Sequence, residues 1–194
     1  MTRIDDSQTP LVFDSQRAWA DWLAKHHDSS TGVWLRIART SSKLASVTYA
    51  EALESALCHG WIDGQKKSDG PTHWLQRFTP RTARSIWSKV NREKALALIE
   101  RGEMTPAGRR EVERAKADGR WERAYDSHRT STVPDDLLAA MDARPGARRF
   151  FDTLDARNRY AILWRVQTAK KSDTRARRIA TLAEMLARHE KLHP

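Results

Sequence analysis

Residues 56–91 combine aromatic and polar side chains in a proportion that is unusual for either a core or an ordinary surface. Three tryptophans are interleaved there with aspartate, arginine, serine and asparagine. Aromatic walls exclude water from a pocket, and a few convergent polar groups then discriminate between ligands. We therefore predict a ligand-binding pocket lined by Trp61, Asp63, Trp74, Arg77, Arg81, Trp87 and Asn91.

The arginines of this stretch indicate what such a pocket would bind. A guanidinium group forms forked hydrogen bonds with a carboxylate or a phosphate, and an indole ring stacks on a planar or apolar body. The predicted ligand is a small anionic or aromatic molecule that is held by Arg77 and Arg81 and is bound without catalysis. On this hypothesis Arg81→Ala abolishes binding and leaves the protein stable, whereas unfolding of the variant would mark Arg81 as structural.

Asp63 is the candidate for catalysis. A carboxylate at the start of a predicted strand, beside a glycine, could act as the general base on a small anionic substrate, and an unchanged pH profile of turnover in Asp63→Asn would eliminate that role. The favoured alternative is an ion pair with Arg77 or Arg81 across a hairpin. The chain shows no catalytic-triad spacing, phosphate loop or dinucleotide fingerprint, so an enzymatic function is left open.

The cysteine and histidine residues do not indicate a reactive or metal-binding site. Cys58 is expected in the last turn of a helix, where the helix dipole raises the pKa of a thiol, and it is interpreted as a small buried residue. Cys58, His59 and the pair His26 and His27 lack the paired spacing of zinc ligands. We predict no metal and no cofactor.

A second cluster of polar side chains surrounds the expected start of the last helix. Lys170, Lys171, Arg175 and Arg178 crowd the end of a helix whose free amides already carry partial positive charge. Nearby carboxylates, a phosphate group or nucleic acid could balance this charge. The slightly favoured alternative is that the arginine stems pack between helices.

The charge of the chain is unevenly distributed. Residues 1–70 contain 8 Lys/Arg and 9 Asp/Glu, residues 71–129 contain 14 and 8, and residues 130–194 contain 13 and 8, for a net charge of +10. Such a balance favours anionic partners, so nucleic-acid binding by the basic helical half is an alternative function. The alternative explanation of this excess of lysine and arginine is that these residues form solvated helix faces without a partner molecule. A recognised nucleic-acid-binding fold signature is absent.

The pocket residues must be positioned by a small α+β part. The patterns predict a short strand near residues 12–13, a helix from Asp14 or Ser15 to His27, a strand at 33–38, a helix from the capping box at Thr48 to Gly60, and strands at 61–66 and 72–78. After Pro80 only helices are predicted, over 91–101 and 106–119 and after Pro134, Pro145, Asp155 and the caps Asp173 and Thr174.

The predicted fold class is α+β, with a small N-terminal antiparallel sheet and its helices followed by a mainly α-helical C-terminal half. We expect two subdomains, residues 1–90 and 91–194, packed together as one unit. The single cysteine, the polar start of the chain and the lack of a long apolar run predict a cytoplasmic protein that does not insert into a membrane. The sequence does not indicate an oligomeric state.

Several segments resemble the YdeI/OmpD-associated family, the bacteriocin-protection or OmdA-like proteins of bacteria. The resemblance rests on residues 56–64 (ALCHGWIDG), 78–81 (FTPR), 85–91 (SIWSKVN), 104–108 (MTPAG) and 169–179 (AKKSDTRARRI), and it extends over nearly the whole chain. His59 departs from the pattern, which usually has an aromatic residue there.

The resemblance implies a link with stress tolerance and with resistance to cationic antimicrobial peptides or bacteriocins. It provides no catalytic residues. A chain of net charge +10 would not sequester a cationic peptide, and the absence of a signal peptide predicts that the chain stays out of the periplasm. We therefore expect any protective role to be indirect and to act from inside the cell.

Overall fold

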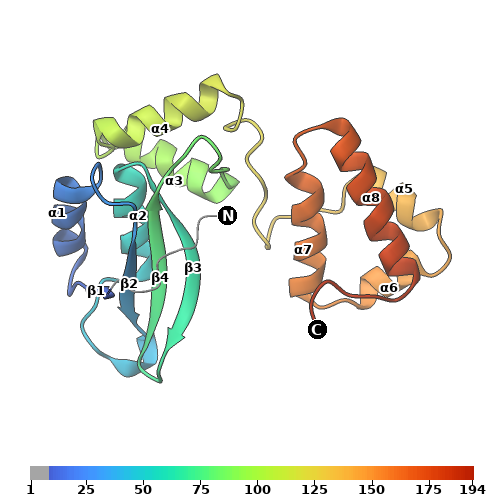
Figure 1. Cartoon of the computed structure of the whole chain (residues 1–194), viewed down its shortest axis with the longest axis horizontal. Helices are drawn as coiled ribbons and strands as arrows, with labels where there is room; N and C mark the ends of the chain where they lie inside the picture. Colours follow the sequence, from blue (N-terminus) through green and yellow to red (C-terminus); the bar gives the residue numbers. More distant parts are fainter. Residues whose placement is uncertain (1–8) are drawn as a thin grey trace. The chain divides into compact units, whose positions relative to one another are not determined.

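The computed structural model describes residues 9–194, which form two compact units (Figure 1). The first unit comprises the described residues up to Ile86 together with Asn91–Glu122, and the second comprises Trp87–Val90 and Arg123–Pro194. The first six residues, on which the prediction of location partly rests, lie outside the described part.

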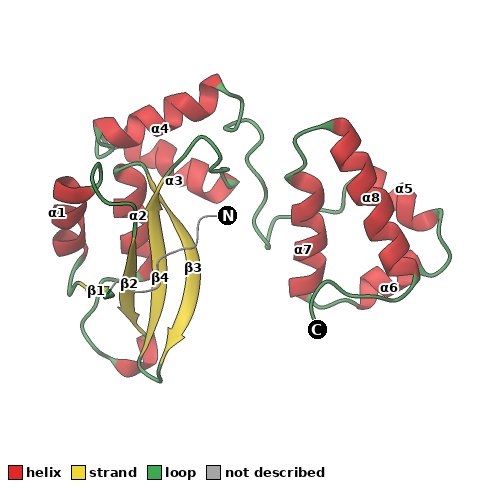
Figure 2. Cartoon of the chain, viewed as in Figure 1, coloured by secondary structure: helices red, strands yellow, loops and turns green. Residues whose placement is uncertain are grey.

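The first unit is built on a four-stranded sheet with the order β1-β2-β4-β3 (Figure 2). The strands are β1 (Leu11–Val12), β2 (Val33–Ala38), β3 (Trp61–Asp69) and β4 (His73–Pro80). The pairs β2–β4 and β3–β4 are antiparallel, which confirms the predicted hairpin and small sheet. The sheet as a whole is mixed, because the short edge strand β1 runs parallel to β2. Helix α1 (Gln16–His26) connects these two strands, and such a crossover returns the chain in the same direction.

The other helices of this unit begin where local capping signals place them. Helix α2 (Tyr49–Cys58) starts at the predicted capping box of Thr48 and Glu51, and α4 (Pro106–Ala117) starts at Thr105, whose side chain accepts from the amide of Gly108. The remaining elements are the 3₁₀ turn η1 (Thr40–Ser42) and helix α3 (Lys89–Glu100).

The core of the first unit lies between α1, α2 and one face of the sheet. Trp19 is fully buried there, stacks on Trp22 with ring centroids 5.4 Å apart, and meets Phe78 of β4 at 5.7 Å. The indole nitrogen of Trp19 donates to the carbonyl of Ala52 over 3.0 Å, which satisfies its polar group inside the core. Of the two tryptophans of α1 that were predicted to belong to the core, Trp19 is fully buried and Trp22 is half-buried beside it.

The second unit contains helices α5 (Asp135–Asp142), α6 (Ala147–Thr153), α7 (Ala156–Gln167) and α8 (Ser172–Ala187). Helix α8 packs against the other three. The predicted caps Asp173 and Thr174 were wrong, because α8 begins two residues earlier. Its N-cap is Lys171, which makes no side-chain capping bond, so both predicted caps lie inside the first turn. The buried core consists of Leu137, Met141, Ala147, Phe151, Leu154, Ile162, Leu163, Val166, Ile179, Leu182, Ala183 and Leu186.

The grouping of α3 and α4 with the sheet differs from the predicted division after residue 90. Helix α4 packs on α2, where Thr105 Oγ1 donates to the carbonyl of Cys58 over 2.5 Å. The segment Trp87–Val90 groups with the helical unit because Ser88 forms a parallel bridge with Tyr125. Within residues 9–194, no helix is both long enough and apolar enough to cross a membrane.

Candidate ligand-binding site

Trp61 lies in the aromatic core of the first unit. Its side chain is 1% exposed, and its ring meets the rings of Trp19 and Trp22 edge-on at 6.4 and 6.1 Å. The indole nitrogen donates to the carbonyl of His27 over 3.1 Å. Trp61 therefore helps to fix α1 on the sheet.

Trp74 and Arg77 lie on opposite faces of β4, because side chains alternate along a strand. Arg77 is 8% exposed, and its guanidinium carbon lies 5.9 Å from the ring of Trp34. Trp74 shares the face of Ile37, its partner in β2. The structure thus does not bring these two predicted site residues together.

Arg81, Trp87 and Asn91 are all at most 8% exposed. Arg81 turns its guanidinium group along the loop that follows β4, where Nη1 donates to the carbonyl of Ile86 over 3.3 Å. Trp87 belongs to the residues grouped with the helical unit, whereas Arg81 and Asn91 belong to the first unit. These three side chains do not line the hollow described below.

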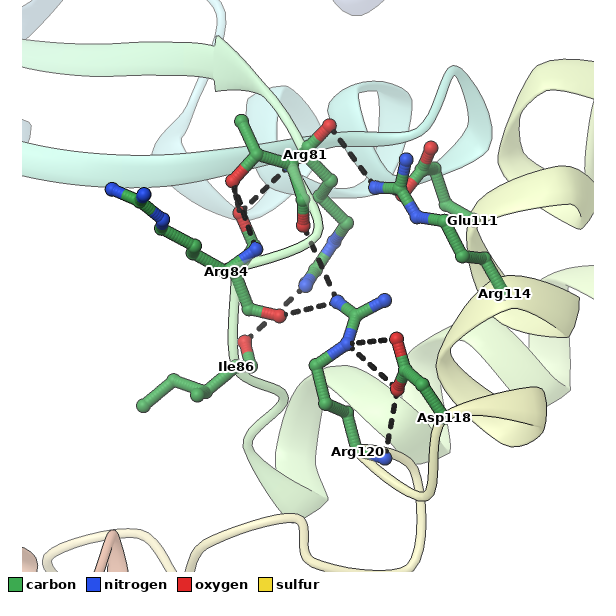
Figure 3. A network of polar contacts seen from close by, with 9 residues as sticks. Arg81, Arg84, Ile86, Glu111, Arg114, Asp118 and Arg120 are labelled. Carbon is green, nitrogen blue, oxygen red and sulfur yellow. Dashed lines mark hydrogen bonds and ion pairs between the residues drawn. The ribbon is translucent and has the colours of Figure 1, made fainter. Parts of the chain in front are cut away.

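The loop 81–86 is held by a network of buried and half-buried charges (Figure 3). Arg120, which is 4% exposed, binds Asp118 through Nε at 2.7 and 2.8 Å and donates from Nη1 to the carbonyl of Ser85 over 2.7 Å. Arg114 contacts Glu111 and donates to the carbonyl of Arg81 over 3.3 Å.

Glu111 is the titratable group whose pKa this network changes. Burial raises its pKa, and Arg114, Arg81, Arg120 and Arg110 oppose that shift without cancelling it. The cations of the network are directed at backbone carbonyls and at two carboxylates. We therefore interpret the cluster as the device that fixes the shape of the loop.

Asp63 is bound by a tyrosine that the sequence analysis did not single out. Tyr49 Oη donates to Asp63 Oδ2 over 2.8 Å, and the Tyr49 ring lies 5.8 Å from the ring of Trp74. The predicted ion pair with Arg77 or Arg81 is not present in the described part of the chain. Asp63 and Trp74, two of the seven predicted residues, are therefore neighbours through Tyr49.

Trp74 borders two hollows of the first unit, of about 540 and 380 Å³, whose walls share Trp74 and Arg39. We call them together the Trp74 hollow. The larger lies between Trp74 and the segment 37–49, which contains η1 and the start of α2. The smaller adds residues 66–68 of β3.

The wall of the Trp74 hollow carries charge of one sign. Arg39, Lys43, Lys66 and Lys67 line it, and no aspartate or glutamate among residues 9–194 does. Lys67 Nζ also lies 4.6 Å from the ring of Trp34, a cation–π contact. Arg39 Nη2 donates to Ser68 Oγ over 3.2 Å. Lys67 pairs with Leu75, so its ammonium group lies on the face of Trp34 and Arg77, opposite to Trp74. The other three cations, beside the rings of Trp74 and Tyr49, can hold an anionic group whose planar part stacks on an aromatic ring.

The predicted cluster at the start of α8 divides into two pairs. Arg175 forms a two-pronged ion pair with Asp136 of α5 at 2.7 and 2.9 Å, and this bond lowers the pKa of Asp136. Arg178 donates to the carbonyl of Arg165 in α7 over 2.6 Å. Both arginines thus join helices, and they do so through hydrogen bonds of their guanidinium groups. Lys170 and Lys171 are exposed.

Cys58 and His59 lie at the end of α2. Burial raises the pKa of the Cys58 thiol to about 11, which keeps it protonated and unreactive at neutral pH. Burial also lowers the pKa of His59, whose Nδ1 lies 2.9 Å from the carbonyl of Ser55. In the described residues, no group of three or more His, Cys, Asp or Glu side chains could hold a metal ion.

The fold and these sites define a two-part protein, an α+β unit with a cationic and aromatic hollow followed by a helical unit. Residues 11–111 match the model of a family described as a domain of unknown function, DUF8412, and this match covers more than half of the chain. The chain therefore belongs to the DUF8412 family. Residues 130–189 match the family described as "Bacteriocin-protection, YdeI or OmpD-Associated", so a YdeI/OmpD-associated domain is present in its C-terminal part. No curated protein and no solved structure matches the chain significantly.

These matches confirm the resemblance for the C-terminal part and show where it lies. Residues 169–179, one of the five segments that suggested it, fall inside the YdeI/OmpD-associated match. The other four segments lie between residues 56 and 108, within the DUF8412 match. The expected motifs of the first half are therefore matched by a different family model.

Three of the residues that sequence reasoning missed lie in the segment between β2 and the first residue of α2. Arg39, Lys43 and Tyr49 belong to a stretch that was interpreted as a loop and a helix start. Only the fold shows that this stretch crosses the end of the sheet beside Trp74. The available signal was the absence of acidic residues from residues 37–50, which contain two cations and one tyrosine.

Proposed function

We propose that the Trp74 hollow binds a small anionic molecule with a planar or aromatic part, and that it does so without catalysis. The observation that carries the proposal is the wall itself, in which three cations, Arg39, Lys43 and Lys66, occur with the rings of Trp74 and Tyr49 and without a carboxylate. Phosphate or carboxylate groups would be held by Arg39, Lys43 and Lys66, and the planar part would stack on Trp74.

Calorimetric titration with three probes separates the two parts of this proposal. Adenosine 5′-monophosphate carries an anion and a planar ring, adenosine carries only the ring, and ribose 5-phosphate carries only the anion. We expect the monophosphate to bind most tightly. Base–aromatic stacking is worth about 1–3 kcal/mol, so Trp74→Leu should weaken its binding about fivefold or more. Lys66→Gln should weaken it and reduce its dependence on salt.

Lys25→Gln is the matched control, because Lys25 is an exposed lysine on α1 that does not line the hollow. It should leave the affinity unchanged. Equal affinities for all three probes, or an affinity that Trp74→Leu does not alter, would contradict the proposal. Native mass spectrometry of the protein purified from its host would then identify the physiological ligand.

We further propose that this binding takes place in the cytoplasm and contributes to stress or antimicrobial tolerance. The support is the YdeI/OmpD-associated domain and its description as bacteriocin-protection. A host strain that lacks the protein should regain tolerance to a bacteriocin with the wild-type chain and with Lys25→Gln. If Trp74→Leu restores tolerance to the same extent, then tolerance does not depend on binding in the Trp74 hollow.

A further inference from the structure

The helical unit contains a hollow whose chemistry differs from that of the Trp74 hollow. It has a volume of about 320 Å³ and is lined by α5, α6, α7 and the segment before α5, which are labelled or can be followed in Figure 1. Its apolar lining consists of Val133, Leu138, Phe151, Leu154 and Leu163. An apolar body placed there would remove these side chains from water, which favours binding.

Two arginines and one aspartate stand at the rim of this hollow. Arg148 and Arg159 line it together with Asp152, so the lining has an excess of one positive charge. The guanidinium carbon of Arg159 lies 5.3 Å from the ring of Phe151. A cation is thus held directly over the apolar lining, where an anionic head attached to an apolar body would meet it.

The carboxylate partners of both arginines can be exchanged. Arg159 Nη2 lies 3.3 Å from Asp152, and Arg148 Nη1 lies 3.2 Å from Asp142. All four side chains are between 42% and 58% exposed. Exposed pairs of this kind contribute about 0–1 kcal/mol each, so a carboxylate that arrives with buried apolar surface can replace them.

The remaining part of the rim is aromatic and already hydrogen-bonded. Tyr160 Oη donates to the carbonyl of Asp126 over 3.0 Å, and burial raises the pKa of Tyr160 to about 12, which keeps the hydroxyl protonated. The ring of His128 stands edge-on to Tyr160 at 5.5 Å, and its Nε2 lies 3.1 Å from the carbonyl of Ala156. Both rings offer contact area to an apolar body.

We infer that this hollow binds a small amphipathic monocarboxylate, whose aliphatic or aromatic body lies against Leu138, Phe151 and Leu163 and whose carboxylate binds Arg159 and Arg148. The single excess positive charge suits a monoanion better than a phosphate dianion. The volume equals that of about ten water molecules at 30 Å³ each, which suits a short acid. The inference concerns a different site from the proposed function and does not depend on it.

Octanoate is the probe for this inference, and calorimetry of the full chain is the measurement. Octanol, octylamine and acetate serve as comparisons, because they remove the charge, reverse it or remove the apolar body. We expect saturable binding of octanoate that is at least tenfold tighter than that of the other three. Arg159→Gln and Arg148→Gln should each weaken octanoate at least fivefold.

Arg157→Gln is the matched control, since Arg157 lies two residues before Arg159 in α7, is exposed and does not line the hollow. This variant and Trp74→Leu should bind octanoate like the wild type, and circular dichroism of each variant establishes that it is folded. Binding of octylamine as tight as that of octanoate would overturn the inference. So would an absence of octanoate binding at millimolar concentration, or an equal loss in Arg157→Gln.

Discussion

Lys43 has a backbone conformation that most residues avoid. Its φ is 54°, and among residues 9–194 only His189 shares a positive φ without being glycine. His189 follows the end of α8 in a hydrogen-bonded helix terminus, in which its own amide donates to Leu186 and that of Glu190 to Met185. Lys43 also ends a helical segment, as the left-handed C-cap of the 3₁₀ turn, and it lies in the wall of the Trp74 hollow. Strained residues often lie at functional sites, which agrees with a binding role for Lys43.

Lys43→Gly should therefore make the protein more stable and the Trp74 hollow a weaker binding site. The left-handed conformation costs a lysine about 1–2 kcal/mol, and glycine gives back about 0.5–1 kcal/mol through its larger unfolded-state entropy. The net gain in the free energy of unfolding should be up to about 1 kcal/mol, measured by urea denaturation. Lys43→Gln, which keeps the strain and removes the charge, should weaken adenosine monophosphate binding without this gain.

His59 should make the stability of the protein depend on pH near neutrality. Burial lowers its pKa in the folded state, and the ring of His27 at 5.5 Å adds to the shift, while the hydrogen bond with Ser55 opposes it. The unfolded chain therefore binds more protons than the folded chain below the ordinary pKa of 6.5. The free energy of unfolding should fall as the pH is lowered from about 7 to 5.

His59→Phe, which restores the aromatic residue expected from the family resemblance, should flatten this dependence. Urea denaturation at several pH values between 5 and 7 measures it. His26→Gln is the control, because the His26 side chain is exposed. A slope in His59→Phe as steep as that of the wild type would mean that another group titrates.

The residue scale also shows how far the sequence could define the site. Trp74 and Asp63 do lie near each other, through Tyr49. Trp74 and Arg77 could have been separated in advance, because three residues along a strand place two side chains on opposite faces. The burial of Arg81 could not be predicted, since it depends on carbonyl groups of a loop whose shape is fixed by two residues distant in sequence, Arg114 of α4 and Arg120 in the turn that follows it.

At the scale of elements, the contact between α2 and α4 explains the motif at residues 104–108. Thr105 caps α4 and also bonds to Cys58 at the end of α2, and Met104 is 4% exposed. A Cβ atom at Gly108 would meet the carbonyl oxygens of Cys58 and Leu57, the latter at 2.9 Å. The glycine thus allows the two helices to approach closely.

Gly108→Ala should destabilise the first unit. Alanine in a helix is usually favoured over glycine by about 1 kcal/mol, but overpacking against a fixed backbone costs about 1–3 kcal/mol or more. We expect the second effect to dominate and the midpoint of urea denaturation to fall. Gly64→Ala is the matched control, since the added Cβ would meet its neighbours no closer than 3.7 Å. A Gly108→Ala protein as stable as the wild type would show that α4 can shift on α2.

Arg120 should be structural for the loop 81–86. Arg120→Met removes the hydrogen bonds that the guanidinium group donates to the carbonyl of Ser85 and to the carboxylate of Asp118. We expect the free energy of unfolding to fall by about 2–3 kcal/mol in urea denaturation. Arg84→Met is the control, because it changes an exposed side chain of the same loop. Its free energy of unfolding should fall by less than about 0.5 kcal/mol.

Elements whose signals are local could be predicted, and those that depend on distant partners could not. Thr48 with Glu51, and Thr105 with Pro106, define helix starts within four residues, and both starts are as predicted. The start of α8 was missed because Lys171 carries no capping side chain. The short strand predicted near residues 12–13 lies at Leu11–Val12, but its parallel pairing with β2 depends on a distant partner and was not predicted.

At the scale of the whole molecule, the chain passes between its two units more than once. Trp87–Val90 group with the helical unit although α3 continues in the first. The amide of Lys89 donates to Tyr125 over 2.8 Å, that of Tyr125 donates to Trp87 over 3.0 Å, and Lys89 Nζ lies 2.7 Å from Asp126. A boundary drawn at a single residue, as the sequence suggested, cannot describe this arrangement.

Hydrogen exchange can test whether each of the two units unfolds independently of the other. Leu182→Ala removes a side chain from the core of the helical unit and should cost about 2–5 kcal/mol there. Exchange should become faster in α5–α8 and stay unchanged in β2 and β4. Leu35→Ala, in the core of the first unit, should have the converse effect.

The amides of Lys89 and Tyr125 distinguish this grouping from a simple division along the chain. Both are hydrogen-bonded within the segment that groups with the helical unit, so both should exchange faster in Leu182→Ala than in the wild type. If the amide of Lys89 instead responds only to Leu35→Ala, then Trp87–Val90 belong energetically to the first unit. Faster exchange in both units for either variant would show that they unfold as one cooperative body, which is what the sequence analysis expected of subdomains packed together.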